Sequence, residues 1–154
     1  MLTGLRPGEV IGLEWADIHG SMVNVSRSVN VEGEQTRGKN ENAVRSFQLS
    51  ALACHVLDEQ REAAGGLGSV FRITNEQHYY KRWKTYCAVN SLTPCSLYEL
   101  RHTFVSVVKT LPAGEVKSLV GHSADMDTFG IYAHTLTGDA AHTAQAVNGV
   151  FLQV

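Results

Sequence analysis

The chain has 154 residues, of which 44% are hydrophobic and 18% are charged. This composition excludes a disordered chain, and the length suffices for one globular domain with a buried core. No apolar run approaches the roughly 20 residues that a membrane-spanning helix needs, and the first residues lack the charged and apolar regions of a signal peptide. The net charge of −2 argues against a uniformly basic nucleic-acid binder, although a local basic patch remains compatible with it.

The cysteines suggest a reducing environment. Cys54, Cys87 and Cys95 are odd in number and have no paired spacing, which is typical of free thiols in a cytoplasm. No CxxC or HxxxH spacing occurs, so we expect no zinc site. We expect no other metal and no cofactor.

The front of the chain predicts one short helix followed by a hairpin. Pro7 suits the first position of a helix, and Glu9 lies in the first turn, where a carboxylate interacts favourably with the helix dipole. Valines alternate with polar residues over 21–31, which predicts a strand with the valines on one face. The polar segment 32–42 is expected to form a long hairpin tip, and 43–49 a second strand.

The rest of the chain is expected to be helical. Ser50 predicts a cap for a helix over 51–63 with Leu52, Val56 and Leu57 on one side. Segment 70–73 is either a strand or a connector. Further helices are expected from Thr74 or Asn75 to about 89, from Ser96 or Leu97 to 109, and over 115–120, 125–132 and 139–152. The densest basic cluster consists of Lys81, Arg82 and Lys84. It is either a solvated helix face or a surface that contacts DNA. The fold class is therefore α+β, mainly α-helical, with a small antiparallel β-hairpin or sheet near the N-terminus.

Four motifs that carry chemistry follow one another along the chain. They are Thr-Gly-Leu-Arg-x-x-Glu-x-x-x-Leu-x-Trp-x-Asp-Ile over 3–18, Gly-Lys at 38–39 before Arg-Ser-Phe-Gln-Leu at 45–49, Tyr-Glu-Leu-Arg-His-Thr-Phe over 98–104, and Gly-His-Ser with Met-Asp-Thr-Phe-x-x-Tyr-x-His over 121–134. Together they supply two arginines, a histidine and a tyrosine. Arginines can hold a phosphodiester, a histidine can donate a hydrogen bond to it, and a tyrosine can attack phosphorus.

In this order the four motifs resemble the catalytic domain of the tyrosine recombinases, the phage and conjugative-transposon integrases. The resemblance covers nearly the whole chain. It implies the catalytic-domain fold of that family over 1–154. Because the family carries an N-terminal DNA-clamping domain before the first of these motifs, we expect this chain to be a truncated form. The resemblance also implies that the last helix, about 139–152, docks on a partner protomer, whereas packing on its own core is the alternative.

The resemblance assigns the catalytic roles. Arg6 and Arg101 would clamp the scissile phosphate, because a guanidinium fork fits its oxygens better than an ammonium does. His122 would hydrogen-bond the same phosphate. Tyr132 would attack phosphorus to give a 3′-phosphotyrosyl bond and a free 5′-hydroxyl. Lys39 would protonate the leaving 5′-oxygen, with Arg37 as a neighbouring candidate.

Three further residues are expected to support the site. Glu9 would be a buried support, or else a solvated helix charge. His134 would assist the site, or else bind a helix end. Tyr98 occupies the position where much of the family has histidine. A tyrosine hydroxyl, with a pKa in water of about 10, is a poor base at neutral pH but can donate a hydrogen bond.

The expected partner is double-stranded DNA with attachment-type sites. The expected function is site-specific recombination for a mobile element, without ATP or metal because the phosphotyrosine keeps the bond energy. The resemblance implies a tetramer on DNA, a monomer off it, and a cytoplasmic location in a bacterial or phage context, with no membrane partner. Two alternatives remain: an inactive integrase fragment that keeps the fold and weak DNA or protein binding, and a DNA-relaxing enzyme without a defined target.

Overall fold

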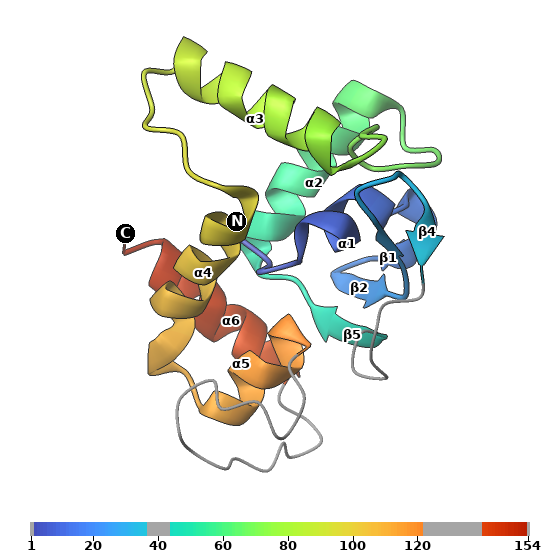
Figure 1. Cartoon of the computed structure of the whole chain (residues 1–154). Helices are drawn as coiled ribbons and strands as arrows, with labels where there is room; N and C mark the ends of the chain where they lie inside the picture. Colours follow the sequence, from blue (N-terminus) through green and yellow to red (C-terminus); the bar gives the residue numbers. More distant parts are fainter. Residues whose placement is uncertain (1, 37–43, 122–139, 154) are drawn as a thin grey trace.

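The structure is a computed structural model that describes residues 2–36, 44–121 and 140–153 (Figure 1). The front of the chain contains one short helix and two small sheets. Its elements are α1 (Pro7–Gly12), the 3-10 turn η1 (Trp15–Asp17), β1 (Ile18–His19), β2 (Met22–Val25), β3 (Ser28–Val29), β4 (Gln35–Thr36) and β5 (Arg45–Gln48).

The larger sheet joins two segments that are distant in sequence. Its strand order is β1-β2-β5, all antiparallel. Val23 pairs with Phe47 and Val25 pairs with Arg45. Val23, Val25 and Phe47 are buried. Since side chains two residues apart share a face of a strand, the register points Arg45 toward the same buried side as Phe47.

The strand expected over 21–31 is wrong in its length, because the chain leaves the first sheet after Val25. Arg27 turns toward η1, where it forms ion pairs with Glu14 (2.9 Å) and Asp17 (3.0 Å). β3 then pairs with β4 in a separate two-stranded sheet. Val29 is only half-buried and Val31 is 50% exposed, so the four valines do not share one buried face.

The expected hairpin tip over 32–42 also contains a strand. Asn30 closes a tight turn, since its backbone N–H donates to the Glu34 carbonyl at 2.9 Å and its side-chain oxygen accepts from the Glu34 N–H at 2.8 Å. β4 follows directly after this turn. The rest of the expected tip, 37–43, lies outside the described residues. The expected second strand is confirmed as β5.

The rest of the described chain is helical. Its elements are α2 (Ala51–Ala64), α3 (Glu76–Val89), α4 (Leu97–Val107), the 3-10 turn η3 (Val108–Thr110), α5 (Ala113–Val120) and α6 (Ala140–Phe151). The expected cap Ser50 is confirmed, because its side chain accepts from a backbone N–H of the first turn of α2. The side chains of Asn75 and Ser96 do the same for α3 and α4, which decides between the two starting residues expected for each of these helices. Segment 70–73 is a connector that anchors itself through the fully buried Val70. The helix expected over 125–132 lies outside the described residues.

The inner face of α2 differs from the expectation. Ala53, Leu57 and Ala64 are buried, whereas Val56 is 43% exposed and Leu52 is half-buried. Residues at i, i+4 and i+11 lie on one side of a helix, and small alanines allow α2 to pack closely there. The apolar character of Val56 therefore led to the wrong prediction that it lies on the inner face of α2.

One core lies between the larger sheet and the helices α2, α4, α5 and α6, and the last helix covers its own core. Phe104, Val116, Val120 and Val147 are buried together with the inner residues of the sheet. In Figure 1, α6 lies beside α4 and α5. The ring centroids of Phe104 and Phe151 are 5.9 Å apart. The arrangement confirms a mainly helical α+β fold with small sheets near the N-terminus. None of the helices in the described ranges is long and apolar enough to cross a membrane.

Candidate active site

Four of the eight predicted site residues lie in the described chain. Arg6, Glu9 and Arg101 form one connected group, and Tyr98 lies one helical turn before Arg101. Outside the described residues lie Lys39 with its neighbour Arg37, His122, Tyr132 and His134.

Arg6 is held by the start of α1. It is the N-cap residue, with Pro7 at the first helical position. Its backbone N–H donates to Glu9 Oε2 at 2.9 Å, and its Nη1 donates to Glu9 Oε1 at 2.8 Å. Gly4 makes the approach possible: its φ is +61°, and an added Cβ would lie 2.3 Å from Phe104 Cδ1. A side chain at Gly4 would therefore push the Arg6 segment off α4.

Glu9 is a buried carboxylate shared by two arginines. It is 4% exposed. Arg45, with a side chain 8% exposed, donates from Nη1 to Oε1 at 3.0 Å and from Nη2 to Oε2 at 2.9 Å. Burial by itself raises the pKa of Glu9, but the hydrogen bonds and charge of Arg45, followed by the bonds from Arg6, outweigh it and lower the pKa below its usual value. Glu9 is thus an anion held in place and not a solvated helix charge.

Arg101 is a buried cation on α4, 7% exposed. Its Nη1 donates to the Gly4 carbonyl at 2.6 Å and its Nη2 to the Val120 carbonyl at 2.8 Å. Burial, followed by the nearby charges of Arg6 and Arg45, lowers the pKa of Arg101 to about 10, with Glu9 acting in the opposite direction. The guanidinium therefore remains charged at neutral pH.

Three consecutive carbonyls at the end of α5 each accept from a different arginine. Arg45 Nε donates to the Leu119 carbonyl at 2.9 Å, Arg101 to the Val120 carbonyl, and Arg6 Nη2 to the Gly121 carbonyl at 3.0 Å. The last carbonyls of a helix lack partners within it and carry partial negative charge. The three cations satisfy them. Gly121, with φ +64°, ends α5 at this place, and His122 is the next residue of the chain.

Tyr98 lies at the edge of this group. It is in the first turn of α4 and is 50% exposed. It lies near enough to Arg101 to oppose the fall in the pKa of that arginine. His102, next to Arg101 in the chain, is exposed, so the helix turns it away from the buried arginine as its position predicts.

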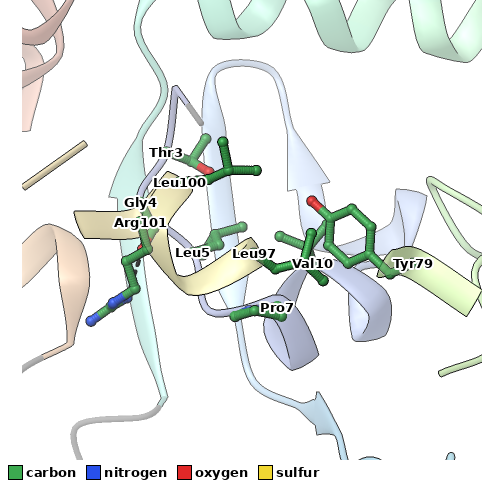
Figure 2. Close-up of a pocket in the computed structure, with 9 residues that line it drawn as sticks. All are labelled: Thr3, Gly4, Leu5, Pro7, Val10, Tyr79, Leu97, Leu100 and Arg101. Carbon is green, nitrogen blue, oxygen red and sulfur yellow. Dashed lines mark hydrogen bonds between the residues drawn. The ribbon is translucent and has the colours of Figure 1, made fainter. Parts of the chain in front are cut away.

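A small pocket lies behind Arg101 and is lined mainly by apolar side chains (Figure 2). Figure 2 shows the Arg101 guanidinium extending away from Leu97, Val10 and Tyr79. The charged end of Arg101 therefore belongs to the arginine group and not to this pocket.

Arg45 lies within the second motif, but the motifs assign it no role. Its signal lies in the alternation of β5, where Arg45 takes the same phase as the buried Phe47 and Leu49. An arginine in a buried phase needs a carboxylate or carbonyl partner. The alternation alone could have marked it.

The group can bind an anion. We name it the arginine cluster and define it as Arg6, Arg45, Arg101 and Glu9. Three guanidinium groups and one carboxylate give it a formal charge of +2, in a chain whose net charge is −2. Guanidinium forks suit the oxygens of phosphate. Lys81, Arg82 and Lys84 lie elsewhere, on exposed positions of α3.

Comparisons with known proteins agree with the motifs. The model of the phage integrase family matches residues 1–138. The chain is 26% identical over 157 residues to the ICEBs1 integrase of Bacillus subtilis (strain 168), covering 86% of this chain and 42% of that protein. It is 23% identical over 185 residues to a XerC-like tyrosine recombinase of Caldanaerobacter subterraneus subsp. tengcongensis, covering 97% of this chain and 47% of that protein. The chain thus spans less than half the length of these curated relatives.

The fold is also similar to solved structures. The Tn1549 transposon integrase in complex with transposon right end DNA matches with a TM-score of 0.66 and 20% identity, over 91% of this chain and 53% of that one. The same integrase with circular intermediate DNA matches with a TM-score of 0.64 and 19% identity, over 91% and 54%. This likeness confirms the integrase catalytic-domain fold that the motifs implied.

Proposed function

The chain belongs to the phage integrase family, and from that membership we propose that it is the catalytic part of a tyrosine-type DNA recombinase. In this proposal residues 1–154 form one catalytic domain. It acts in site-specific integration or excision of a mobile element by cleaving and rejoining double-stranded DNA at attachment-type sites. The location is the cytoplasm of a bacterial cell, where such DNA resides.

The arginine cluster is the observation that carries the proposal. Arg101 is buried and fixed by two backbone carbonyls, whereas the Arg6 side chain is 31% exposed. Arg6 can therefore contact a phosphate from solvent, while the buried charge of Arg101 attracts the same phosphate from the protein interior. Donors fixed in advance stabilise the charge that develops on phosphoryl oxygens better than mobile ones do.

In the first step of the proposed reaction, Tyr132 attacks the scissile phosphate. The Tyr132 oxygen forms a bond to phosphorus as its hydroxyl loses its proton to solvent water, and the bond from phosphorus to the 5′-oxygen breaks. Lys39 gives a proton to that oxygen. His122 donates a hydrogen bond to the phosphate, and Tyr98 and His134 have supporting roles. Attack by another strand's 5′-hydroxyl reverses the step and rejoins DNA without ATP or metal.

Assembly on DNA is a further part of the proposal. The structures of the Tn1549 integrase contain DNA, which supports double-stranded DNA as the partner. We propose a tetramer in the complex that joins two sites, with α6 of one protomer docked on another. Docking in this way requires α6 to leave Phe104, and also Leu52, whose N–H donates to Asn148 Oδ1 at 3.0 Å.

Relaxation of a negatively supercoiled plasmid, without metal or ATP, tests the proposed chemistry because it needs no known target. We expect the purified chain to relax the plasmid and Tyr132→Phe to be inactive. A covalent protein–DNA adduct should appear only with the unsubstituted chain. Equal relaxation by both proteins would refute the nucleophile. No relaxation by either would favour an inactive fragment that retains the fold, and relaxation without recombination between two defined sites would favour a DNA-relaxing enzyme.

A further inference from the structure

Two arginines bridge Glu9 and the end of α5, and they differ in exposure. Arg6 contacts Glu9 and the Gly121 carbonyl, and Arg45 contacts Glu9 and the Leu119 carbonyl. The Arg6 side chain is 31% exposed, whereas that of Arg45 is 8% exposed. Only Arg6 of this pair can readily meet a ligand from solvent.

We propose that Arg45 is a positioning residue of the DNA-cleavage reaction: it neutralises Glu9 and fixes the end of α5, and thereby leaves the charge of Arg6 for the phosphate. The inference rests on the proposed function. It assigns Arg45 no contact with DNA.

The charges give the first argument. Glu9 carries one negative charge. If Arg6 were its only partner, the pair would be neutral and would attract a phosphate weakly. Arg45 takes both oxygens of Glu9 in a bidentate pair, the strongest geometry for such a contact. With Glu9 matched by Arg45, Arg6 and Arg101 remain as the net charge of the cluster.

The geometry gives the second argument. Arg45 is rooted in β5, where it pairs with Val25 of β2. Its Nε–H reaches the Leu119 carbonyl, one residue before the carbonyl that Arg101 binds and two before the one that Arg6 binds. Arg45 thus ties the sheet to α5. Because Arg45 holds the end of α5 against the sheet, it also positions the Val120 and Gly121 carbonyls that Arg101 and Arg6 bind.

The surroundings of Glu9 allow a sharp test. Among the described residues, the charged groups that act on it are Arg6 from the α1 cap, Arg45 from β5 and Arg101 from α4. Arg45 makes the largest contribution that lowers the pKa of Glu9, against the burial that raises it. Loss of Arg45 should therefore raise the pKa of Glu9, whereas loss of an arginine elsewhere should not.

The test compares Arg45→Met and Arg45→Lys with the matched control Arg27→Met. Arg27 also pairs with a buried carboxylate, that of Asp17, so its loss has a similar structural cost away from the cluster. The first readout is the titration of the Glu9 carboxyl by carbon NMR in the free protein. We expect it to move to higher pH in Arg45→Met and to stay unchanged in Arg27→Met. The Leu119 carbonyl resonance should shift in Arg45→Met only.

The second readout is plasmid relaxation as a function of pH. Misplacement by a residue outside the chemistry can lower a rate on the order of 10-fold to 100-fold. We expect a fall of that size in Arg45→Met, and the acid limb of the profile should move to higher pH. In the double variant Arg45→Met with Glu9→Gln, that shift of the limb should disappear because no carboxyl titrates. Arg45→Lys should restore the Glu9 titration in part but the rate less, since an ammonium cannot span two oxygens and a carbonyl.

A purely structural role would lower the rate equally at all pH values, with Arg27→Met affected as much. That result, or an unchanged Glu9 titration in Arg45→Met, overturns the inference. If Arg45→Met does not fold, the same two readouts on Arg45→Lys decide. If the unsubstituted chain relaxes no plasmid, the proposed function fails for this chain, while the Glu9 titration and the Leu119 resonance still decide whether Arg45 holds Glu9 and α5.

Discussion

Two clusters of arginine and carboxylate lie in the described part of the chain, and their charge ratios differ. At the arginine cluster, one buried carboxylate, Glu9, serves two arginines, with a third nearby. At η1, one arginine, Arg27, serves two carboxylates, Glu14 and Asp17. The first group has an excess of positive charge and the second an excess of negative charge. Both stabilise local structure, but only the first can accept an anion.

The two clusters also differ in what they hold together. Arg27, which directly precedes β3, is tied to η1, an element close in sequence. The arginine cluster joins the α1 cap, β5, α4 and α5, with hydrogen bonds between these elements that span 19 to 115 residues along the chain. A long-range polar group costs ordering entropy and desolvation. Its presence in the interior is therefore better explained by a ligand than by stability alone.

The largest expected effect comes from Arg101→Lys. Lysine keeps the charge, but its single ammonium cannot match the two-point contact of the guanidinium with the Gly4 and Val120 carbonyls. We expect plasmid relaxation to fall on the order of 10²-fold, as when a group that positions the reacting atoms is displaced. Relaxation assays with Arg27→Lys as the control check this. Similar losses in both variants would contradict the difference drawn between the clusters.

The next effect concerns stability. Glu9→Gln removes the only described carboxylate between Arg6 and Arg45 and leaves two cations facing each other, so we expect the free energy of unfolding to fall by about 3 kcal/mol. Asp17→Asn should cost less, because Arg27 keeps its pair with Glu14. Urea denaturation of both variants measures the difference. A larger loss for Asp17→Asn would show that burial, and not the number of cations, sets the cost.

The pH dependence follows from the lowered pKa of Glu9. A carboxyl whose pKa is lower in the folded state stabilises the protein above its unfolded pKa, and this stability is lost as pH falls through the folded pKa. The contribution of Glu9 should therefore be complete at neutral pH, begin to fall near the ordinary pKa of 4.5 and be lost once the pH is below the folded pKa. Between pH 7 and pH 2.5, the midpoint temperature of thermal unfolding should fall less steeply for Glu9→Gln than for the unsubstituted chain. Parallel curves would contradict the assignment.

Local chemistry explains how much of the fold could be predicted from the sequence. The caps of α2, α3 and α4 depend on Ser50, Asn75 and Ser96 within a few residues, so the cap of α2 was predicted correctly and the starts of α3 and α4 to within one residue. The break after Val25 was missed because it depends on Arg27 reaching Glu14 and Asp17 in space. Alternation of valines cannot report that contact. The exposure of Val56 was missed for the same reason, since the partners of α2 decide which side is covered.

The candidate site was predictable in composition but not in connection. The motifs named Arg6, Glu9 and Arg101, and the structure brings these three together. The carbonyls of Leu119, Val120 and Gly121 have no signature in side-chain identity, because any residue supplies a carbonyl. Arg45 had a signature in the buried phase of β5, although the motif reading assigned it no role. The roles of Lys39, His122, Tyr132 and His134 stay predictions.

The smallest expected effect tests how far the arginine cluster extends toward solvent. Tyr98→Phe removes only a hydroxyl from a side chain that is 50% exposed, so the free energy of unfolding should change by less than about 0.5 kcal/mol. If the hydroxyl donates to the phosphate, its loss costs about 1 kcal/mol, and relaxation should fall several-fold. Tyr86→Phe, on the exposed side of α3, is the matched control and should relax normally. Unchanged relaxation in Tyr98→Phe would show that the Tyr98 hydroxyl does not contribute to the site. The phosphate would then be bound by the arginines and the residues of the last motif alone.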